Sequence, residues 1–228
     1  LIRDARVLTM LAPGETRPPM GGRRGRGMDE LGVVPLADVL IESGKVAAVW
    51  PVDGGGSAGR VPVPEGTEEI FAHRRVLMPG FVDCHTHACW AGSRIDEWER
   101  KLAGATYLEI LQSGGGIMST VRATRAASED ELVASLSARF WRMVAFGTTT
   151  IEVKSGYGLS TEHELKMLRA ITRAAMGFPG TVVPTALIAH TIDANQSDFV
   201  ERTLHETLDA VHAEFPGIAI DAYCEKGA

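Results

Sequence analysis

The chain has 228 residues, of which 45% are hydrophobic, and its formal net charge is −6. This composition is typical of a globular protein with room for one large domain or two smaller ones. The mild acidity argues against a nucleic-acid surface, which needs a basic face, and no apolar run approaches the roughly 20 residues of a membrane span. The three cysteines fit neither a zinc-finger spacing nor a closed disulfide framework, and we find no signal-peptide pattern, so we expect a cytoplasmic protein.

The first third of the chain predicts short strands. Residues 5–10 predict one strand, and residues 37–50 predict a hairpin with Ser43-Gly44 at its turn. Two segments rich in glycine, residues 14–30 and 53–60, predict loops.

From residue 78 onward, strand-like and helix-like segments alternate. We expect strands at residues 80–88, 148–155, 181–190 and 218–226, and helices at residues 129–146, 161–175 and 197–213. Ser128 with Glu131, and Thr161 with Glu164, match the capping box that begins a helix. Residues 89–128 predict a long loop. The alternation implies a parallel sheet, either doubly wound or half of a (β/α)8 barrel, and the first strand is not followed by the Gly-x-Gly-x-x-Gly of dinucleotide-binding folds.

Two histidines separated by one residue, His85 and His87, lie at the end of the first expected strand of this region. Side chains two apart on a strand point to the same face, and neutral imidazole is a ligand for zinc and iron. Lys154, His190 and Glu225 lie near the carboxyl ends of the next expected strands, which is the edge where parallel α/β folds form their active sites. The pattern therefore predicts a shared metal-dependent site.

Several motifs resemble one known family. "PGFVDCHTH" is similar to the first-strand signature of the amidohydrolase superfamily, and "AGSR", "YLEILQSGGGIMSTVRATR", "TTTIEVKSGYGL", "ELKMLR" and "CEKG" resemble the imidazolonepropionase family. The resemblance implies a (β/α)8 barrel with a small β-sandwich domain. Residues 1–77 would be part of the sandwich, and residues 78–228 would be the first four β/α units. It also implies a fragment of a longer chain that forms a homodimer when full length.

The resemblance further implies a chemistry. The family hydrolyses the cyclic amide C–N bond of 4-imidazolone-5-propanoate, a small-molecule substrate, to N-formimidoyl-L-glutamate with one Zn²⁺ or Fe ion. By resemblance, His85 and His87 are metal ligands, and Arg94 holds the substrate propionate. Tyr157 donates a hydrogen bond to the substrate, and His190 contacts the substrate near the scissile carbonyl as a catalytic residue. The remaining metal ligands and the acid/base residue are expected downstream of this chain.

Some roles stay open at this point. Lys154 is interpreted as structural, Tyr107 and Gly114–Gly116 as a loop over the substrate ring, and Cys89 and Glu225 as residues of undecided role. Two alternatives to the main reading remain: another amidohydrolase, such as a deaminase or a cyclic amidase, and a truncated scaffold without catalysis.

Overall fold

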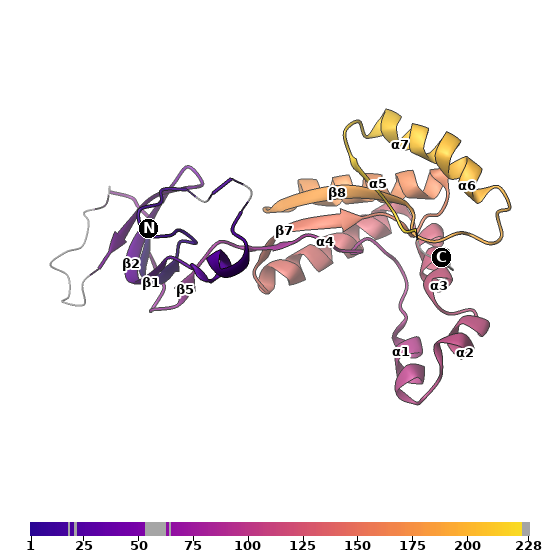
Figure 1. Cartoon of the computed structure of the whole chain (residues 1–228), viewed down its shortest axis with the longest axis horizontal. Coiled ribbons are helices and arrows are strands. Elements are labelled where there is room, and N and C mark those ends of the chain that lie inside the picture. The colour runs from indigo at the N-terminus through magenta and orange to yellow at the C-terminus, as the bar shows by residue number, and fades with distance from the viewer. Residues whose placement is uncertain (18, 21, 53–62, 64, 225–228) are drawn as a thin grey trace. The chain divides into compact units, whose positions relative to one another are not determined.

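The computed structural model describes residues 1–17, 19–20, 22–52, 63 and 65–224. The chain divides into two compact units, Leu1–Pro79 and Gly80–Ala228 (Figure 1). This division lies two residues beyond the one expected from the sequence. The loop expected at residues 53–60 lies outside the described residues.

The first unit is built on one five-stranded sheet. Its strands follow the order β3-β2-β1-β4, and β5 also pairs with β1; their bounds are β1 Ile2–Leu8, β2 Val33–Glu42, β3 Lys45–Pro51, β4 Ile70–Phe71 and β5 Val76–Leu77. The predicted hairpin is confirmed as β2 and β3. Ser43 and Gly44 at its turn both have positive φ, 50° and 75°, as a tight two-residue hairpin turn requires.

The core of the first unit is small. Ala5 and Val7 of β1 pack against Ala37 and Val39 of β2. A second sheet of the expected sandwich is not among the described strands. The loop expected at residues 14–30 contains one short 3-10 helix, η1, at Gly25–Asp29.

The second unit contains a four-stranded parallel sheet with helices in its connections. The strands follow the sequential order β6-β7-β8-β9. Their bounds are β6 Phe81–Asp83, β7 Thr148–Lys154, β8 Thr181–Ala189 and β9 Ala219–Ala222. A doubly wound sheet reverses its strand order, whereas a barrel adds strands in sequence. The sheet is therefore that of a half-barrel in a mixed α/β unit, as one of the two sequence alternatives predicted.

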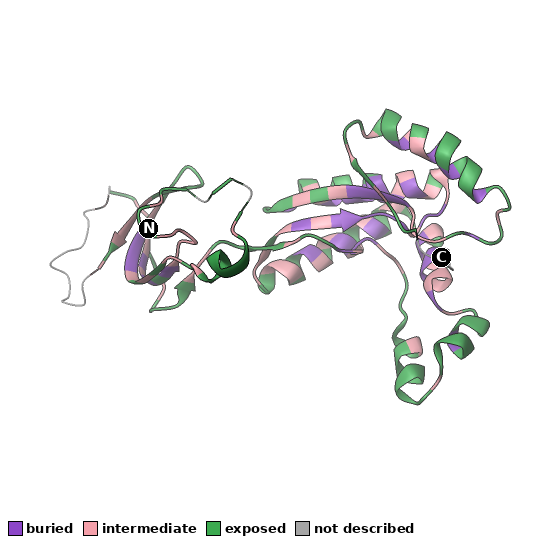
Figure 2. Cartoon of the chain, in the orientation of Figure 1, coloured by how far each residue is buried: buried purple, intermediate pink, exposed green. Residues whose placement is uncertain are grey.

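Two long helices cover one face of this sheet. Leu136 and Phe140 of α4, Glu129–Ala145, and Ile171 of α5, Thr161–Met176, share one core with Ile151 and Val153 of β7. Figure 2 shows the buried positions gathered where these strands and helices meet. The alternate residues of β7, Glu152 and Lys154, belong to the opposite face of the sheet.

The last connection is a continuous helical run. It consists of α6 Phe199–Arg202, the π-helical turn η3 Thr203–Thr207 and α7 Leu208–Glu214, close to the predicted helix at residues 197–213. Among the described residues, none of the helices combines the length and apolar character that a membrane crossing requires.

The predicted long loop after the histidines was wrong. Residues 89–128 contain three helices: α1 Ile95–Leu102, α2 Tyr107–Gln112 and α3 Ile117–Ala126. Thr106 and Glu109 form a complete capping box at the start of α2. α1 and α2 have only eight and six residues, so the helical period has little room to repeat in either of them.

Of the two predicted capping boxes, one is confirmed and one is wrong. The Ser128 hydroxyl accepts from the backbone N–H of Glu131, and the Glu131 carboxylate accepts from the N–H of Ser128, so α4 begins as predicted. In α5, by contrast, Ser160 precedes the helix and Thr161 is its first residue. Glu164 turns away from the helix start and accepts hydrogen bonds from the preceding loop instead.

Candidate active site

We expected the histidine pair to lie within a strand, but the structure places it beyond the strand's end. β6 ends at Asp83, two residues before His85. The chain nevertheless stays attached to β7 through Thr86: its carbonyl accepts from the N–H of Lys154 at 3.0 Å, and its hydroxyl donates to the carbonyl of Glu152 at 2.6 Å. Because Thr86 is turned toward β7, its two neighbours lie together, with ring centroids 5.3 Å apart.

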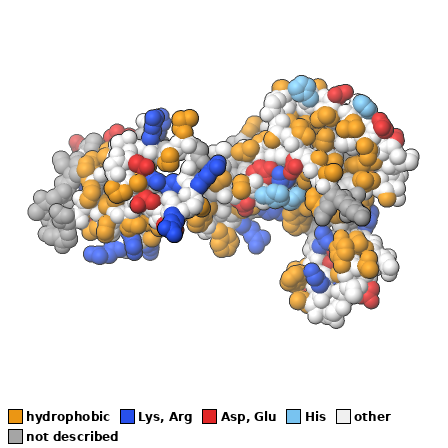
Figure 3. Space-filling model, in the orientation of Figure 1, with side chains coloured by type: hydrophobic (Ala, Val, Ile, Leu, Met, Phe, Trp, Pro, Cys, Tyr) orange, Lys and Arg blue, Asp and Glu red, His pale blue; other side chains and the backbone are white. Residues whose placement is uncertain are grey.

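Four rings from three separate segments gather at the carboxyl edge of the sheet. His190, directly after β8, stacks on His87 with ring centroids 4.5 Å apart and an interplanar angle of 15°. Tyr157, after β7, lies 6.0 Å from His87 and 5.1 Å from His190. His85 completes the group. Figure 3 shows histidine side chains at the surface of this unit beside acidic and basic groups.

The two stacked histidines favour the neutral state. Burial first, then the neighbouring His190 and His85, lower the pKa of His87 to about 4. Burial also lowers the pKa of His190. The Nδ1 atom of His87 is buried and has no hydrogen-bond partner among the described residues. Neutral imidazole with an unsatisfied nitrogen is the form that a metal ion binds.

His190 has a defined tautomer. Its Nδ1 lies 3.1 Å from the carbonyl oxygen of Gly156. A carbonyl oxygen only accepts hydrogen bonds, so Nδ1 carries the proton and the neutral ring presents a lone pair at Nε2. In this state Nε2 of His190 can accept a hydrogen bond, whereas donation to an oxyanion requires the protonated ring.

The residues at this edge fit a metal ion, but they provide only some of the ligands that it needs. His85 and His87 offer two imidazoles at one point, but the described residues contain no group of three or more histidine, cysteine or acidic side chains that could hold an ion. Cys89 does not add a ligand, because it is fully buried in the core of the unit and burial raises its pKa to about 12. Two imidazoles placed in this way could supply part of a Zn²⁺ or Fe site, which would need further ligands.

Lys154 is held as a cation by two carboxylates. Its Nζ lies 2.7 Å from Glu152 and 2.9 Å from Asp221 of β9. Burial lowers the pKa of Lys154, but the hydrogen bonds to these two partners outweigh it and leave the pKa raised. An ammonium group fixed in this way joins β7 to β9 at the edge of the sheet, which agrees with its structural interpretation.

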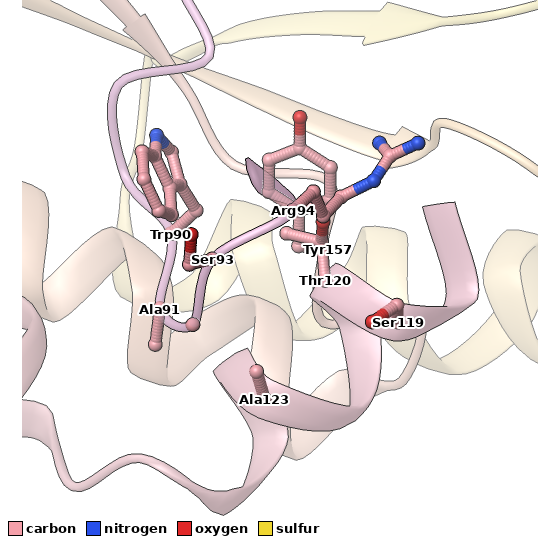
Figure 4. A pocket seen from close by; sticks show the side chains of 9 residues that line it. Trp90, Ala91, Ser93, Arg94, Ser119, Thr120, Ala123 and Tyr157 are labelled. Carbon is pink, nitrogen blue, oxygen red and sulfur yellow. The ribbon is translucent and has the colours of Figure 1, made fainter. Parts of the chain in front are cut away.

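A pocket of about 250 Å³ opens beside the ring cluster. It is lined by the loop that follows the histidines, by α3 and by Tyr157; the side chains drawn in Figure 4 are Trp90, Ala91, Ser93, Arg94, Ser119, Thr120, Ala123 and Tyr157. Tyr157 lies between the Trp90 indole and the Arg94 guanidinium in this view. Burial raises the pKa of Tyr157, so its hydroxyl keeps its proton and can donate. The fold therefore places Arg94 and Tyr157, both predicted from the sequence, in one pocket (Figure 4).

Arg94 is oriented by Glu97. Its Nε donates to Glu97 at 2.9 Å and its Nη2 lies 2.8 Å from the same oxygen, while the other oxygen of Glu97 accepts from the backbone N–H of Gly116 at 3.1 Å. Nη1 has no hydrogen-bond partner among the described residues. The guanidinium therefore keeps donors for an acidic ligand, and Glu97 ties the loop of Arg94 to the glycines before α3.

Other expected residues lie elsewhere. Tyr107 is 64% exposed and does not line the pocket of Figure 4, but it lines a second depression that shares Arg94 with that pocket. Glu225 lies outside the described residues. Sequence reasoning missed Glu152, Asp221 and Glu97. The two-residue spacing of Glu152 and Lys154 on one strand is a signal that could have found the first, whereas Asp221 and Glu97 have no such local signal.

Comparisons with known proteins connect this geometry to one group of enzymes. The chain is 44% identical over 227 residues to the imidazolonepropionase of Symbiobacterium thermophilum, covering 96% of this chain and 53% of that protein. It is 45% identical to the imidazolonepropionase of Methylobacterium nodulans, covering 99% of this chain and 52% of the relative. The chain thus spans about half the length of the curated relatives it matches. No family model matches the chain.

Among solved structures, the fold is similar to 5-methylcytosine deaminase from Klebsiella pneumoniae liganded with 5-fluorocytosine. The TM-score is 0.53 at 15% sequence identity, and the match covers 98% of this chain and 50% of that one. This likeness concerns the fold alone and agrees with the half-barrel sheet of the second unit. This chain is a sequence relative of the imidazolonepropionases over nearly its whole length, and it spans about half of theirs.

Proposed function

We propose that this chain forms the first half of an imidazolonepropionase, which hydrolyses the cyclic amide C–N bond of 4-imidazolone-5-propanoate to N-formimidoyl-L-glutamate. The observation that carries the proposal is the convergence of His85, His87, Tyr157 and His190 beside a pocket that contains Arg94. An imidazolone ring has amide and N–H groups, and its propionate is an anion. The pocket offers a cation and a hydroxyl donor, and His190 beside Tyr157 offers a nitrogen acceptor, which together form the complementary set.

Each side chain has a role that its geometry permits. Arg94 binds the propionate through its free donors, because guanidinium matches a planar carboxylate. The Tyr157 hydroxyl donates a hydrogen bond to the substrate. His190 accepts a hydrogen bond at Nε2 and so orients the ring. Together these contacts hold the amide bond near His85 and His87.

The metal belongs to the same proposal. His85 and His87 would hold a Zn²⁺ or Fe ion together with ligands outside the described residues. When bound, such an ion supplies Lewis acidity toward an amide carbonyl and lowers the pKa of water to about 7. The unsatisfied Nδ1 of His87 and the two adjacent rings support this placement.

The experiment that tests the proposal is a substrate comparison on the full-length protein. Imidazolonepropanoate, cytosine, guanine and dihydroorotate are each supplied, and loss of substrate is followed by absorbance and product analysis. We expect turnover of imidazolonepropanoate alone. Turnover of cytosine or guanine would favour a deaminase and turnover of dihydroorotate another cyclic amidase, whereas a metal-loaded protein that turns over none of them would favour a scaffold without catalysis.

The cellular setting is also part of the proposal. We infer a cytoplasmic enzyme that acts as a homodimer when full length. The free state of Cys84, Cys89 and Cys224 supports a reducing compartment. Cell fractionation tests the location, and light scattering of the full-length protein tests the dimer.

A further inference from the structure

The loop that carries Tyr157 has a backbone shape that few residues tolerate. Gly156 has φ of +112° and Leu159 has φ of +49°. A Cβ on Gly156 would lie 3.1 Å from the Cβ and Nδ1 of His190, and a Cβ on Gly158 would lie 2.5 Å from the backbone nitrogen of Glu164. The loop is therefore pressed between His190 on one side and the start of α5 on the other.

One carboxylate accepts hydrogen bonds from three backbone N–H groups of this loop. Glu164 of α5 is fully buried and accepts from the N–H of Gly156 at 2.9 Å, of Gly158 at 2.8 Å and of Leu159 at 2.7 Å. Its two oxygens are both used, since Oε2 serves Gly156 and Oε1 serves the other two. A buried carboxylate is costly unless its lone pairs are satisfied in this way, so the contacts hold the loop and the side chain in one arrangement.

Two carbonyl groups of the same loop accept hydrogen bonds from other side chains. Arg125, at the end of α3, donates from Nε to the carbonyl of Gly158 at 2.7 Å and from Nη2 to that of Leu159 at 3.0 Å. Gln196, in the loop after β8, donates to the carbonyl of Leu159 at 3.1 Å. Side chains from three segments thus fix the backbone of the four residues from Gly156 to Leu159.

The segment presents two groups to the ring cluster. Tyr157 faces the pocket and lies 5.1 Å from the ring of His190. The carbonyl of Gly156 accepts from Nδ1 of His190, and this contact selects the tautomer that leaves Nε2 open to a ligand. The residue whose N–H is held by Glu164 is the same residue whose carbonyl holds His190.

We propose that Glu164 is a positioning residue of the active site, which acts through Gly156 to set the tautomer and orientation of His190 and through the loop to place Tyr157. Glu164 touches no reacting atom, because it is fully buried behind the loop. The expected effect of Glu164 on turnover rests on the proposed function, whereas its expected effect on the tautomer of His190 does not.

The test uses three variants of the full-length protein. Glu164→Gln keeps the size of the side chain but replaces one oxygen by an NH₂ group, which faces a backbone N–H and loses at least one of the three hydrogen bonds. Glu164→Asp keeps both acceptors on a shorter stem. Ile171→Val is the matched control, because Ile171 is also fully buried on α5 but packs in the core away from the loop.

Two readouts are measured, steady-state kinetics and ¹⁵N NMR of labelled histidine, with His190 assigned from a His190→Asn variant. We expect Glu164→Gln to lower kcat about tenfold or more with a smaller change in KM, since a misplaced group near the reacting bond costs rate rather than binding. The His190 signal should lose its single Nδ1-protonated form. Glu164→Asp should retain more kcat than Glu164→Gln, and Ile171→Val should keep both kcat and the His190 signal.

An unchanged His190 signal in a folded Glu164→Gln variant would overturn the proposal, whatever the rate. Equal loss of kcat in Ile171→Val would reduce Glu164 to a stabilising residue and would also overturn it. If Glu164→Gln is not recovered folded, Arg125→Lys perturbs the loop from its carbonyl side and is judged by the same two readouts. If the wild-type protein does not open the imidazolone ring, the proposed function fails, while the NMR comparison still decides the role of Glu164.

Discussion

Replacing Arg94 by lysine is expected to weaken substrate binding while the chemical step is largely kept. In the structure, Nε and Nη2 of Arg94 are engaged by Glu97, and Nη1 remains for a ligand. A lysine has one ammonium group, which cannot satisfy Glu97 and a propionate in the same geometry. A charge-assisted hydrogen bond contributes about 1.5–3 kcal/mol. Because the Arg94 side chain is 43% exposed, we take the lower end, about 1.5 kcal/mol, which corresponds to about a tenfold rise in KM.

The assay is steady-state hydrolysis of imidazolonepropanoate by the full-length protein. Arg100→Lys is the matched control, because Arg100 lies on α1 close to Arg94 but does not line the pocket. We expect a tenfold higher KM for Arg94→Lys, a larger rise for Arg94→Ala and no change for Arg100→Lys. A KM that stays the same in Arg94→Ala would refute the reasoning and show that Arg94 is structural.

Three further outcomes are expected. His85→Ala or His87→Ala in the full-length protein should lose the bound metal and the activity, as measured by elemental analysis; wild-type metal content in both variants would contradict the ligand assignment. Burial raises the pKa of Asp193, but hydrogen bonds, led by the one from Gln196, outweigh burial and lower this pKa from 3.8. The ionised carboxylate therefore stabilises the fold above about pH 3.8, and the stabilisation is lost as the pH falls. Urea unfolding of Asp193→Asn should accordingly depend less on pH below about 4, and an unaltered pH dependence would argue against this role. Residues 1–228 alone should be inactive and self-associate, because one edge of β9 is unpaired within the described residues and Ile220 is 46% exposed; a monomeric, active 228-residue protein in size-exclusion chromatography and turnover assays would disprove this.

Local patterns in the sequence were sufficient for much of the fold. The Ser43-Gly44 hairpin, the capping box at Ser128 and the alternation of strands with helices after residue 78 all depend on residues close together in the chain. Turn geometry, helix caps and side-chain periodicity are short-range effects, so they can be recognised without knowing the fold. The motifs also sufficed to indicate the relatives that the comparison found.

The predictions that failed depended on competition between alternative hydrogen-bond partners or on weak local signals. Glu164 has the position of a capping residue, but the loop before α5 offers three N–H donors that a buried carboxylate satisfies more fully. The strand that was expected to carry His85 and His87 ends at Asp83. The chain beyond it is held to β7 by the hydrogen bond from the Thr86 hydroxyl to the carbonyl of Glu152. The helices α1 to α3 were missed because they span only six to ten residues, which is shorter than the window of about 11 residues in which a helical period is recognised.

The sequence alone determined which residue types are available at the carboxyl ends of the strands: imidazoles, a tyrosine, an arginine and a lysine. Only the tertiary structure decided how they are combined. It stacks His190 on His87, pairs the Lys154 cation of β7 with Asp221 of β9, and sets the tautomer of His190 through Gly156. These relations join segments 34 to 103 residues apart, taking Gly156 with His190 and His87 with His190 as the limits. The physical reason is that parallel strands bring their carboxyl ends to one edge, and only the packing of the loops beyond that edge fixes which side chains meet.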